Sequence, residues 1–369
     1  MNIGLLGFGV VGRGVYEIAN SRKDMHVTKV LCLEDITLPD AQAVKDFGEI
    51  LKDDTIDTVV EAMGGLRPSY SFVRAALEAG KNVVTSNKAL VCTYYDDLIP
   101  LAEKMGVKFR CTAAVGGGIG WLSELERSRR VQNIQEVGGI MNGTCNYILD
   151  NMTRFGLDYS DALKQAQKLG YAEANPATDV DGIDTWHKVI LSSNIAFGVS
   201  MDKETVPVAG IANIQAEDVA NFTAHGLVCK LISTGKRTEK GYSVYVQPTL
   251  VSQGTPESAV PLNYNLITFI GETSDRMSFY GQGAGRYPTA YNVVEDLVDV
   301  LSGKGFYAPY GETVTADNSA AMRYYVRGPW NGAVEETWGS AVITAPVSVS
   351  QMHNWYKENP GAFLAAIWE

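Results

Sequence analysis

Short apolar runs and amphipathic stretches alternate along the first 111 residues of the chain. Apolar runs bounded by turn residues predict buried strands, and a 3.6-residue apolar spacing predicts helices. The strands expected on this basis are Ile3–Leu6, Val27–Leu33, Thr58–Ala62, Asn82–Thr85 and Val107–Cys111. The helices between them are Gly12–Asn20, Pro68–Ala79 and Tyr94–Met105. Strict alternation of this kind predicts an α/β fold with a Rossmann-type, doubly wound parallel sheet.

A glycine-rich link from Val115 to Gly120 ends this alternation. Beyond it the pattern predicts helices from Asp158 to Leu169 and from Gly182 to Phe197. Later apolar runs, Tyr242 to Val251 and Arg276 to Tyr280, are typical of strands. Because these elements no longer alternate, we expect an α+β second domain.

The composition narrows the possible partners and the compartment. The chain has 369 residues and a formal net charge of −11, which disfavours nucleic acid as a partner. Its five cysteines form no CxxC pair and no metal-ligand spacing, so a reducing, cytoplasmic setting is expected. There is no basic leader and no apolar run of about 18 residues, so we expect no membrane association.

A GxGxxG turn follows the first predicted strand and opens the first predicted helix. Its residues are Gly7, Phe8, Gly9, Val10, Val11 and Gly12. Glycines at this spacing allow a tight turn and a close approach of the backbone to a pyrophosphate, which indicates dinucleotide binding rather than a merely glycine-rich turn. Glu34 and Asp35 directly follow the second predicted strand, where a carboxylate binds ribose hydroxyls and repels a 2′-phosphate. The sequence therefore predicts NAD over NADP, and leaves open which acid faces the ribose.

Two further segments lie at predicted strand ends, where ligands of open α/β sheets bind. Gly64 follows the third strand, and Ser86 and Lys88 follow the fourth. Lys88 standing alone would be a surface residue, but at this edge its ammonium can exchange a proton with a reacting oxygen.

The second domain carries an acidic block that begins near Tyr171. Asp184 and Lys188 are four residues apart, on one face of the predicted helix. The plain interpretation is an exposed ion pair that contributes about 0.3 to 0.5 kcal/mol. The alternative is that Lys188 and the acids Glu173, Asp179 and Asp184 bind a zwitterionic amino acid, because an apolar helix follows them.

Several sequence blocks occur together in one order. They are GFGVVG from Gly7, VVTSNKAL from Val83, NGTCNYIL from Asn142, YAEANP to DVDGIDTWHK from Tyr171, and FYGQGAGRYPTA from Phe279. Over about residues 1 to 300 the chain thereby resembles the homoserine dehydrogenase family. Members interconvert L-homoserine and L-aspartate 4-semialdehyde with NAD or NADP, on the way to threonine and methionine. The resemblance implies an oxidoreductase with a small-molecule substrate.

The resemblance also implies roles for individual residues. Lys88 and Lys188 would be the catalytic lysines, with Lys188 or a water that it holds exchanging the hydroxyl proton. The substrate would be positioned by Gly143, Thr144, Glu173, Asp179 and Asp184. Gly283 would lie near the cofactor.

The domain plan implied by the resemblance joins distant parts of the chain. Residues 1–112 and about 285–320 would form the dinucleotide-binding domain, and residues 113–284 the domain that binds substrate and pairs two copies into a homodimer. A monovalent cation such as sodium would bind the backbone carbonyls of Thr112, Val115, Gly117 and Ile119. The chain departs from the family with Thr112 in place of Glu, Gly120 in place of Pro, and Leu33 where NADP-using members carry Arg.

The segment 321–369 resembles a truncated ACT-like remnant. It holds four of the six tryptophans, and this aromatic content favours packing, on the rest of the chain or across a dimer, over a flexible tail or a partner or effector site. Two alternatives to a homoserine dehydrogenase stay open at this point: a dehydrogenase of another small amino or hydroxy acid, and a nucleotide-binding sensor with weak catalysis.

Overall fold

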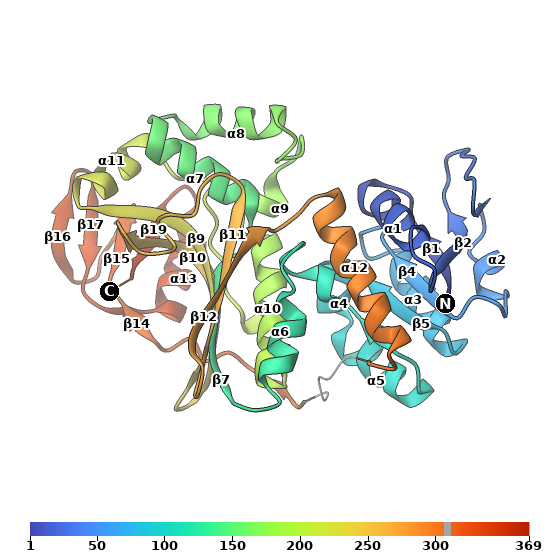
Figure 1. The fold of residues 1–369 in the computed structure, drawn as a ribbon. Coiled ribbons are helices and arrows are strands. Elements are labelled where there is room, and N and C mark those ends of the chain that lie inside the picture. Colours follow the sequence, from blue (N-terminus) through green and yellow to red (C-terminus); the bar gives the residue numbers. More distant parts are fainter. Residues whose placement is uncertain (306–310, 369) are drawn as a thin grey trace. The chain divides into compact units, whose positions relative to one another are not determined.

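The computed structural model describes residues 1–305 and 311–368 (Figure 1). The chain divides into two compact units. Unit 1 contains Met1–Val131, Gly198–Ser200 and Gln282–Glu312, and unit 2 contains Gln132–Phe197, Met201–Gly281 and Thr313–Glu369. None of the helices within the described ranges has the length and apolar character that crossing a membrane requires.

Unit 1 is built on a six-stranded parallel sheet in the order β3-β2-β1-β4-β5-β6, the order of doubly wound dinucleotide-binding folds. The strands are β1 (Asn2–Leu6), β2 (His26–Leu31), β3 (Gln42–Val44), β4 (Thr58–Glu61), β5 (Asn82–Thr85) and β6 (Phe109–Arg110). The helices are α1 (Val10–Asn20), α2 (Gly48–Leu51), α3 (Ser69–Glu78), α4 (Lys88–Thr93), α5 (Tyr95–Met105), η1 (Thr112–Ala114), α6 (Trp121–Ser128) and α12 (Arg286–Leu301). The predicted fold class is confirmed.

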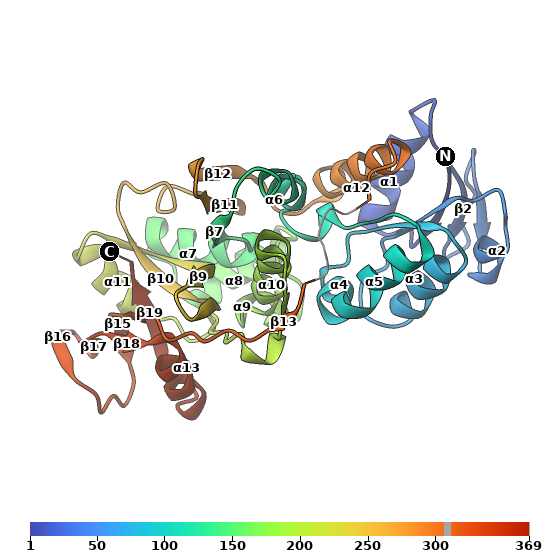
Figure 2. The same ribbon diagram turned by 90° about the horizontal axis from the view of Figure 1, so that it is seen from below.

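Helix α12 comes from a distant part of the chain and completes the core of unit 1. Its residues Ala290, Val293 and Leu297 are fully buried and share one apolar cluster with Val15 of α1 and Ile3 of β1. Figure 2 shows α1 and α12 on one side of the sheet and α3 and α5 on the other. The sheet is therefore covered on both faces, as a parallel sheet requires.

Several boundaries differ from the predicted ones. The second strand ends at Leu31 rather than Leu33, and Leu33 lies in a loop with 88% of its surface exposed. Of the strand predicted over Val107–Cys111, only Phe109–Arg110 (β6) is a strand in the structure. β3 and α2 were not predicted, because three- and four-residue elements carry too few positions to show a period.

Unit 2 contains a nine-stranded mixed sheet in the order β12-β11-β7-β9-β10-β19-β15-β17-β16. Its strands are β7 (Ile134–Ile140), β9 (Leu227–Thr238), β10 (Gly241–Ser252), β11 (Tyr264–Gly271), β12 (Asp275–Gln282), β15 (Tyr324–Arg327), β16 (Val334–Trp338), β17 (Ala341–Thr344) and β19 (Phe363–Ile367). Two short ribbons pair β8 (Ser200–Met201) with β13 (Thr313–Val314) and β14 (Ala321–Met322) with β18 (Val347–Ser348).

The helices of unit 2 surround this sheet. They are α7 (Gly143–Phe155), α8 (Tyr159–Lys168), α9 (Ala177–Val180), α10 (Ile183–Phe197), η2 (Lys203–Thr205), α11 (Ala216–Ala224) and α13 (Val349–Glu358). The long apolar helix α10 packs on β7, β9 and β10 (Figure 2). Twelve of its fifteen residues are buried, so polar groups on its first turn are held away from water.

The aromatic C-terminal segment is part of the nine-stranded sheet. β19 pairs in parallel with β10 and antiparallel with β15. Tyr324, Val326, Met352 and Leu364 form a buried cluster that Trp330 and Trp355 cover. The prediction that these aromatic residues pack on the rest of the chain is confirmed.

Candidate active site

The turn between β1 and α1 has the geometry of a phosphate cradle. Gly7 has a φ of +94°, which L side chains rarely adopt. A methyl group built on Gly9 would meet no atom of the described chain within 4 Å, so the space over this turn is open to a ligand. Helix α1 begins at Val10 without a side-chain cap, and its first N–H groups are therefore available to an anion.

A pocket of about 870 Å³ opens beside this turn, within unit 1. Of the residues predicted to bind the cofactor, Gly7, Phe8, Gly9, Val10 and Glu34 line it. The other lining residues are Arg13, Leu31, Cys32, Leu33, Lys45, Asp46, Phe47, Ala62, Met63, Pro68, Phe72 and Arg286. Its volume, and its mostly apolar lining with a few charged groups, are suited to hold part of a bound dinucleotide.

The structure distinguishes the two acids that follow β2. Glu34 lines the pocket and its carboxylate lies 3.8 Å from Arg13. Asp35 is not among the lining residues, and its fully exposed carboxylate pairs with Lys45 at 2.9 Å. The Lys45 ammonium also donates to the carbonyls of Leu33 and Glu34. Glu34 is therefore the acid in position to contact a ribose.

Other predicted cofactor residues lie near the turn or at neighbouring strand ends without lining this pocket. Val11 and Gly12 belong to the first turn of α1. Gly64 follows β4, and Ser86 and Lys88 follow β5, which is paired in parallel with β4. Gly283 packs against the glycine-rich link, so closely that a methyl group on Gly117 would lie 2.5 Å from the Gly283 carbonyl carbon.

Lys88 is held by the capping of a short helix. It is the first residue of α4, and the Asn87 side chain caps that helix by accepting a hydrogen bond from the Leu90 N–H at 3.1 Å. Asn87 itself is buried, so the turn that carries Lys88 is anchored in the interior of unit 1.

Unit 2 brings together a buried network around Lys188. The Lys188 ammonium lies 2.7 Å from the Asp184 carboxylate and donates to the Met141 carbonyl at 2.7 Å. The Asn142 amide donates to Asp179 at 2.7 Å and to Asp184 at 2.9 Å. Lys188 and Asp184 are 7% and 5% exposed, which rules out the interpretation of an ordinary exposed ion pair.

The other predicted substrate residues differ in position. Gly143 and Thr144 begin α7, directly after Asn142, and the Thr144 hydroxyl donates to the Tyr171 carbonyl. Glu173 is exposed, and it is its backbone carbonyl, not its carboxylate, that accepts a bond from Gln167. Cys145 donates its thiol to the Asp179 carbonyl, and burial raises the pKa of this thiol well above its ordinary value, so it stays neutral.

The glycine-rich link was predicted to bind a monovalent cation through four carbonyls. Three of them already accept hydrogen bonds: Thr112 from the Val115 N–H, Ile119 from the Trp121 N–H, and Gly117 from the Asn292 amide. A carbonyl oxygen has two lone pairs, so these hydrogen bonds are compatible with a cation at the same oxygens. Within residues 1–305 and 311–368, no group of three or more His, Cys, Asp or Glu side chains forms a metal site.

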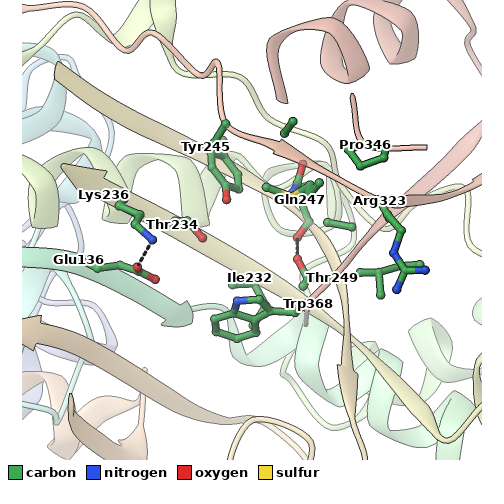
Figure 3. A pocket seen from close by; sticks show the side chains of 15 residues that line it. Glu136, Ile232, Thr234, Lys236, Tyr245, Gln247, Thr249, Arg323, Pro346 and Trp368 are labelled. Atoms are coloured by element: carbon green, nitrogen blue, oxygen red, sulfur yellow. Dashed lines mark hydrogen bonds and ion pairs between the residues drawn. The ribbon is translucent and has the colours of Figure 1, made fainter. Parts of the chain in front are cut away.

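A second cavity, about 420 Å³, lies on the sheet of unit 2 (Figure 3). Its floor comes from β9 and β10, and the C-terminal residues Arg323, Pro346 and Trp368 wall it. Glu136 and Lys236 pair at 3.3 Å at one end. The site residues predicted from the sequence lie elsewhere, so this cavity is separate from the network around Lys188.

Together, a doubly wound domain with an open phosphate cradle and a buried lysine network define a nicotinamide-dependent dehydrogenase. Two family models match: homoserine dehydrogenase, NAD binding domain, over residues 7–112, and homoserine dehydrogenase over residues 121–298. The chain belongs to the homoserine dehydrogenase family, and is an oxidoreductase of amino-acid biosynthesis.

Individual relatives agree with this membership. Homoserine dehydrogenase of Bacillus subtilis is 35% identical over 85% of this chain and 77% of its own length. The structure of a homoserine dehydrogenase from Thiobacillus denitrificans has a TM-score of 0.89 at 28% identity, covering 100% of this chain and 98% of that one. A hyperthermophilic archaeal homoserine dehydrogenase in complex with NADPH, 22% identical, shares the fold with a TM-score of 0.73 over 83% of this chain and 99% of its own.

The sequence did not single out several residues of these sites. Asn142 was not predicted as a site residue by itself, although an Asn directly before a helix is a signal for a cap. In the structure it caps α7 and its amide also donates to Asp179 and Asp184. Arg13, Lys45 and Arg286 line the cofactor pocket, but surface-type cations carry no local signal of this role.

Proposed function

We propose that this chain oxidises L-homoserine to L-aspartate 4-semialdehyde, and reduces it back, with Lys188 exchanging the hydroxyl proton. The buried network of Lys188, Asp184, Asn142 and Asp179 is the observation that carries this proposal. When bound in unit 1, the nicotinamide accepts the hydride in one direction and returns it in the other.

Lys188 has a donor left for the substrate. An ammonium has three N–H groups, and Lys188 uses two of them on Asp184 and the Met141 carbonyl. In the reductive direction the third N–H donates a proton to the aldehyde oxygen, and oxidation reverses this transfer. The carboxylates of Asp179 and Asp184 attract the substrate's ammonium, and Gly143 and Thr144 contact its other end. Lys88, which follows β5, is the second catalytic lysine, and Glu173 helps to position the substrate.

Initial rates with a panel of small alcohols test the substrate. The panel contains L-homoserine, L-serine, L-threonine and 4-hydroxybutyrate, each with NAD and NADP. We expect L-homoserine to give the highest kcat/KM, because it alone in this panel combines an ammonium on the α-carbon with a primary alcohol two carbons further along the chain. A higher kcat/KM with any other alcohol would assign the chain to a different substrate.

We further propose that NAD is preferred over NADP. Glu34 lines the pocket, where its carboxylate accepts hydrogen bonds from ribose hydroxyls and repels a 2′-phosphate. The nearby cations are engaged by the chain itself: Arg13 donates to the Phe8 carbonyl, and Lys45 to the carbonyls of Leu33 and Glu34. Gly64, Ser86 and Gly283 complete the cofactor contacts in this proposal.

The resemblance to the family supports two further proposals about the whole molecule. We propose a homodimer, which light scattering coupled to gel filtration tests. We also propose that a monovalent cation such as sodium binds the carbonyls of Thr112, Val115, Gly117 and Ile119, since a carbonyl that accepts one hydrogen bond, as Gly117 does from Asn292, keeps a second lone pair.

A further inference from the structure

Glu61 is a fully buried carboxylate at the carboxyl end of β4. One of its oxygens accepts hydrogen bonds from the backbone N–H groups of Met63 at 2.9 Å and Gly64 at 3.1 Å. The other oxygen accepts a short hydrogen bond from the Thr85 hydroxyl at 2.6 Å. Glu61 thus joins the turn after β4 to the end of β5.

The Thr85 hydroxyl carries this connection toward Lys88. Its oxygen accepts a hydrogen bond from the Asn87 N–H at 3.0 Å, and the Asn87 amide donates to the Gly65 carbonyl at 2.6 Å. Asn87 in turn caps the helix that begins with Lys88. One carboxylate therefore fixes two loops, the loop Met63–Gly65 and the turn Asn87–Lys88.

Burying a carboxylate is unfavourable unless hydrogen bonds compensate for the lost water. The four donors on Glu61 come from the turn after β4 (Met63 and Gly64), the end of β5 (Thr85) and Asn87 beyond it, and an apolar side chain could accept none of them. Met63, which Glu61 holds, lines the cofactor pocket, and Lys88 follows directly after Asn87. The hydrogen bonds that compensate for burying this charge therefore lie at the edge of the sheet where the cofactor is expected to bind.

We infer that Glu61 is a positioning residue for the dehydrogenase reaction, which holds the cofactor-side loop Met63–Gly65 and the turn of Lys88 in register. This inference rests on the proposed function, because Lys88 has its role there. Glu61 acts through its neighbours.

Glu61→Ala and Glu61→Gln test this role against a matched control, Thr58→Val. Thr58 is also fully buried and lies at the opposite end of β4, where its hydroxyl donates to Asp57 at 2.8 Å. We expect Glu61→Ala to lower kcat by about 100-fold, the size of effect that a small misplacement of reacting groups produces. The KM for the cofactor should rise, and the KM for L-homoserine should stay unchanged.

Partial rescue by the conservative variant separates positioning from folding. In Glu61→Gln the amide oxygen still accepts from Met63 and Gly64, but the amide nitrogen faces the Thr85 hydroxyl, so kcat should lie between wild type and Glu61→Ala. Thr58→Val should lower the melting temperature with no change in kcat. If Glu61→Ala does not fold, Thr85→Val removes the same link and should also lower kcat with an unchanged KM for L-homoserine.

The inference is overturned if the Glu61 and Thr85 variants affect kcat and cofactor KM no more than Thr58→Val does. Binding of NADH, followed by its fluorescence, keeps this test separate from the proposed reaction. If wild type binds NADH but does not oxidise L-homoserine, the proposed function fails, while weaker NADH binding by Glu61→Ala than by Thr58→Val still upholds the role of Glu61 on the cofactor side.

Discussion

Lys188 and Asp184, one helical turn apart on α10, form an ion pair at 2.7 Å that is almost wholly removed from solvent. Two opposite charges at this distance interact strongly where water is excluded, but each would be costly there alone. The carbonyl of Met141 accepts a hydrogen bond from Lys188, and the amide of Asn142 donates one to Asp184. This pair is therefore built into the core of unit 2 rather than placed on its surface.

Removing Asp184 should destabilise the protein as well as inactivate it. In Asp184→Ala the Lys188 ammonium keeps only the Met141 carbonyl, and we expect the free energy of unfolding to fall by about 3 kcal/mol or more. Urea unfolding measures this change. The matched control is Glu78→Ala, which breaks the exposed i, i+4 pair with Arg74 at 3.1 Å and should cost less than about 0.5 kcal/mol. Equal losses in the two variants would contradict the account of a buried pair.

Cofactor choice should depend on Glu34 and not on Asp35. Glu34→Ala removes the carboxylate that lines the pocket, so the ratio of kcat/KM for NAD to that for NADP should fall. Asp35→Ala removes a neighbouring charge that points to solvent and should leave this ratio nearly unchanged. An unchanged ratio in Glu34→Ala would mean that the ribose is recognised by other residues.

The rate should depend on the identity of the monovalent cation. Initial rates measured in sodium, potassium and choline chloride at one ionic strength should be lowest in choline, because the carbonyls of the glycine-rich link keep a lone pair beside the hydrogen bonds that they accept. Equal rates in the three salts would contradict this expectation.

Stability should fall at acidic pH through His353. Burial lowers the pKa of His353 to about 3, from an ordinary value of 6.5. Between these two pH values the unfolded chain binds a proton on His353 that the folded chain excludes. The free energy of unfolding is therefore highest above pH 6.5 and decreases as the pH falls toward 3. His353→Leu should flatten the pH dependence of unfolding near pH 5 by about 1.4 kcal/mol per pH unit. A parallel pH dependence in wild type and variant would contradict the assignment.

Five of the six strands of the parallel sheet of unit 1 were predictable because short apolar runs alternate there with helical patterns, whereas β3 is too short to show a pattern. The nine-stranded sheet was not predictable, because pairs such as β10 with β19 join residues more than a hundred positions apart, and a period-2 pattern shows a strand but not its neighbour. The motifs supplied the candidate site residues, whose roles stay predictions. The burial of Asp184 and Lys188, the position of Glu34 beside the cofactor pocket and the role of Glu61 depend on contacts between distant segments, which the sequence does not display.

The exchange of the hydroxyl proton by Lys188 is tested most directly by the rate of NAD reduction with L-homoserine in wild type and Lys188→Ala, with NADH binding measured in parallel. The account predicts that kcat falls by about 10² to 10⁴, the contribution typical of a proton-transfer group. NADH should bind both proteins equally, because the cofactor pocket lies within unit 1. A kcat near that of wild type, with NADH binding intact, would contradict the role of Lys188.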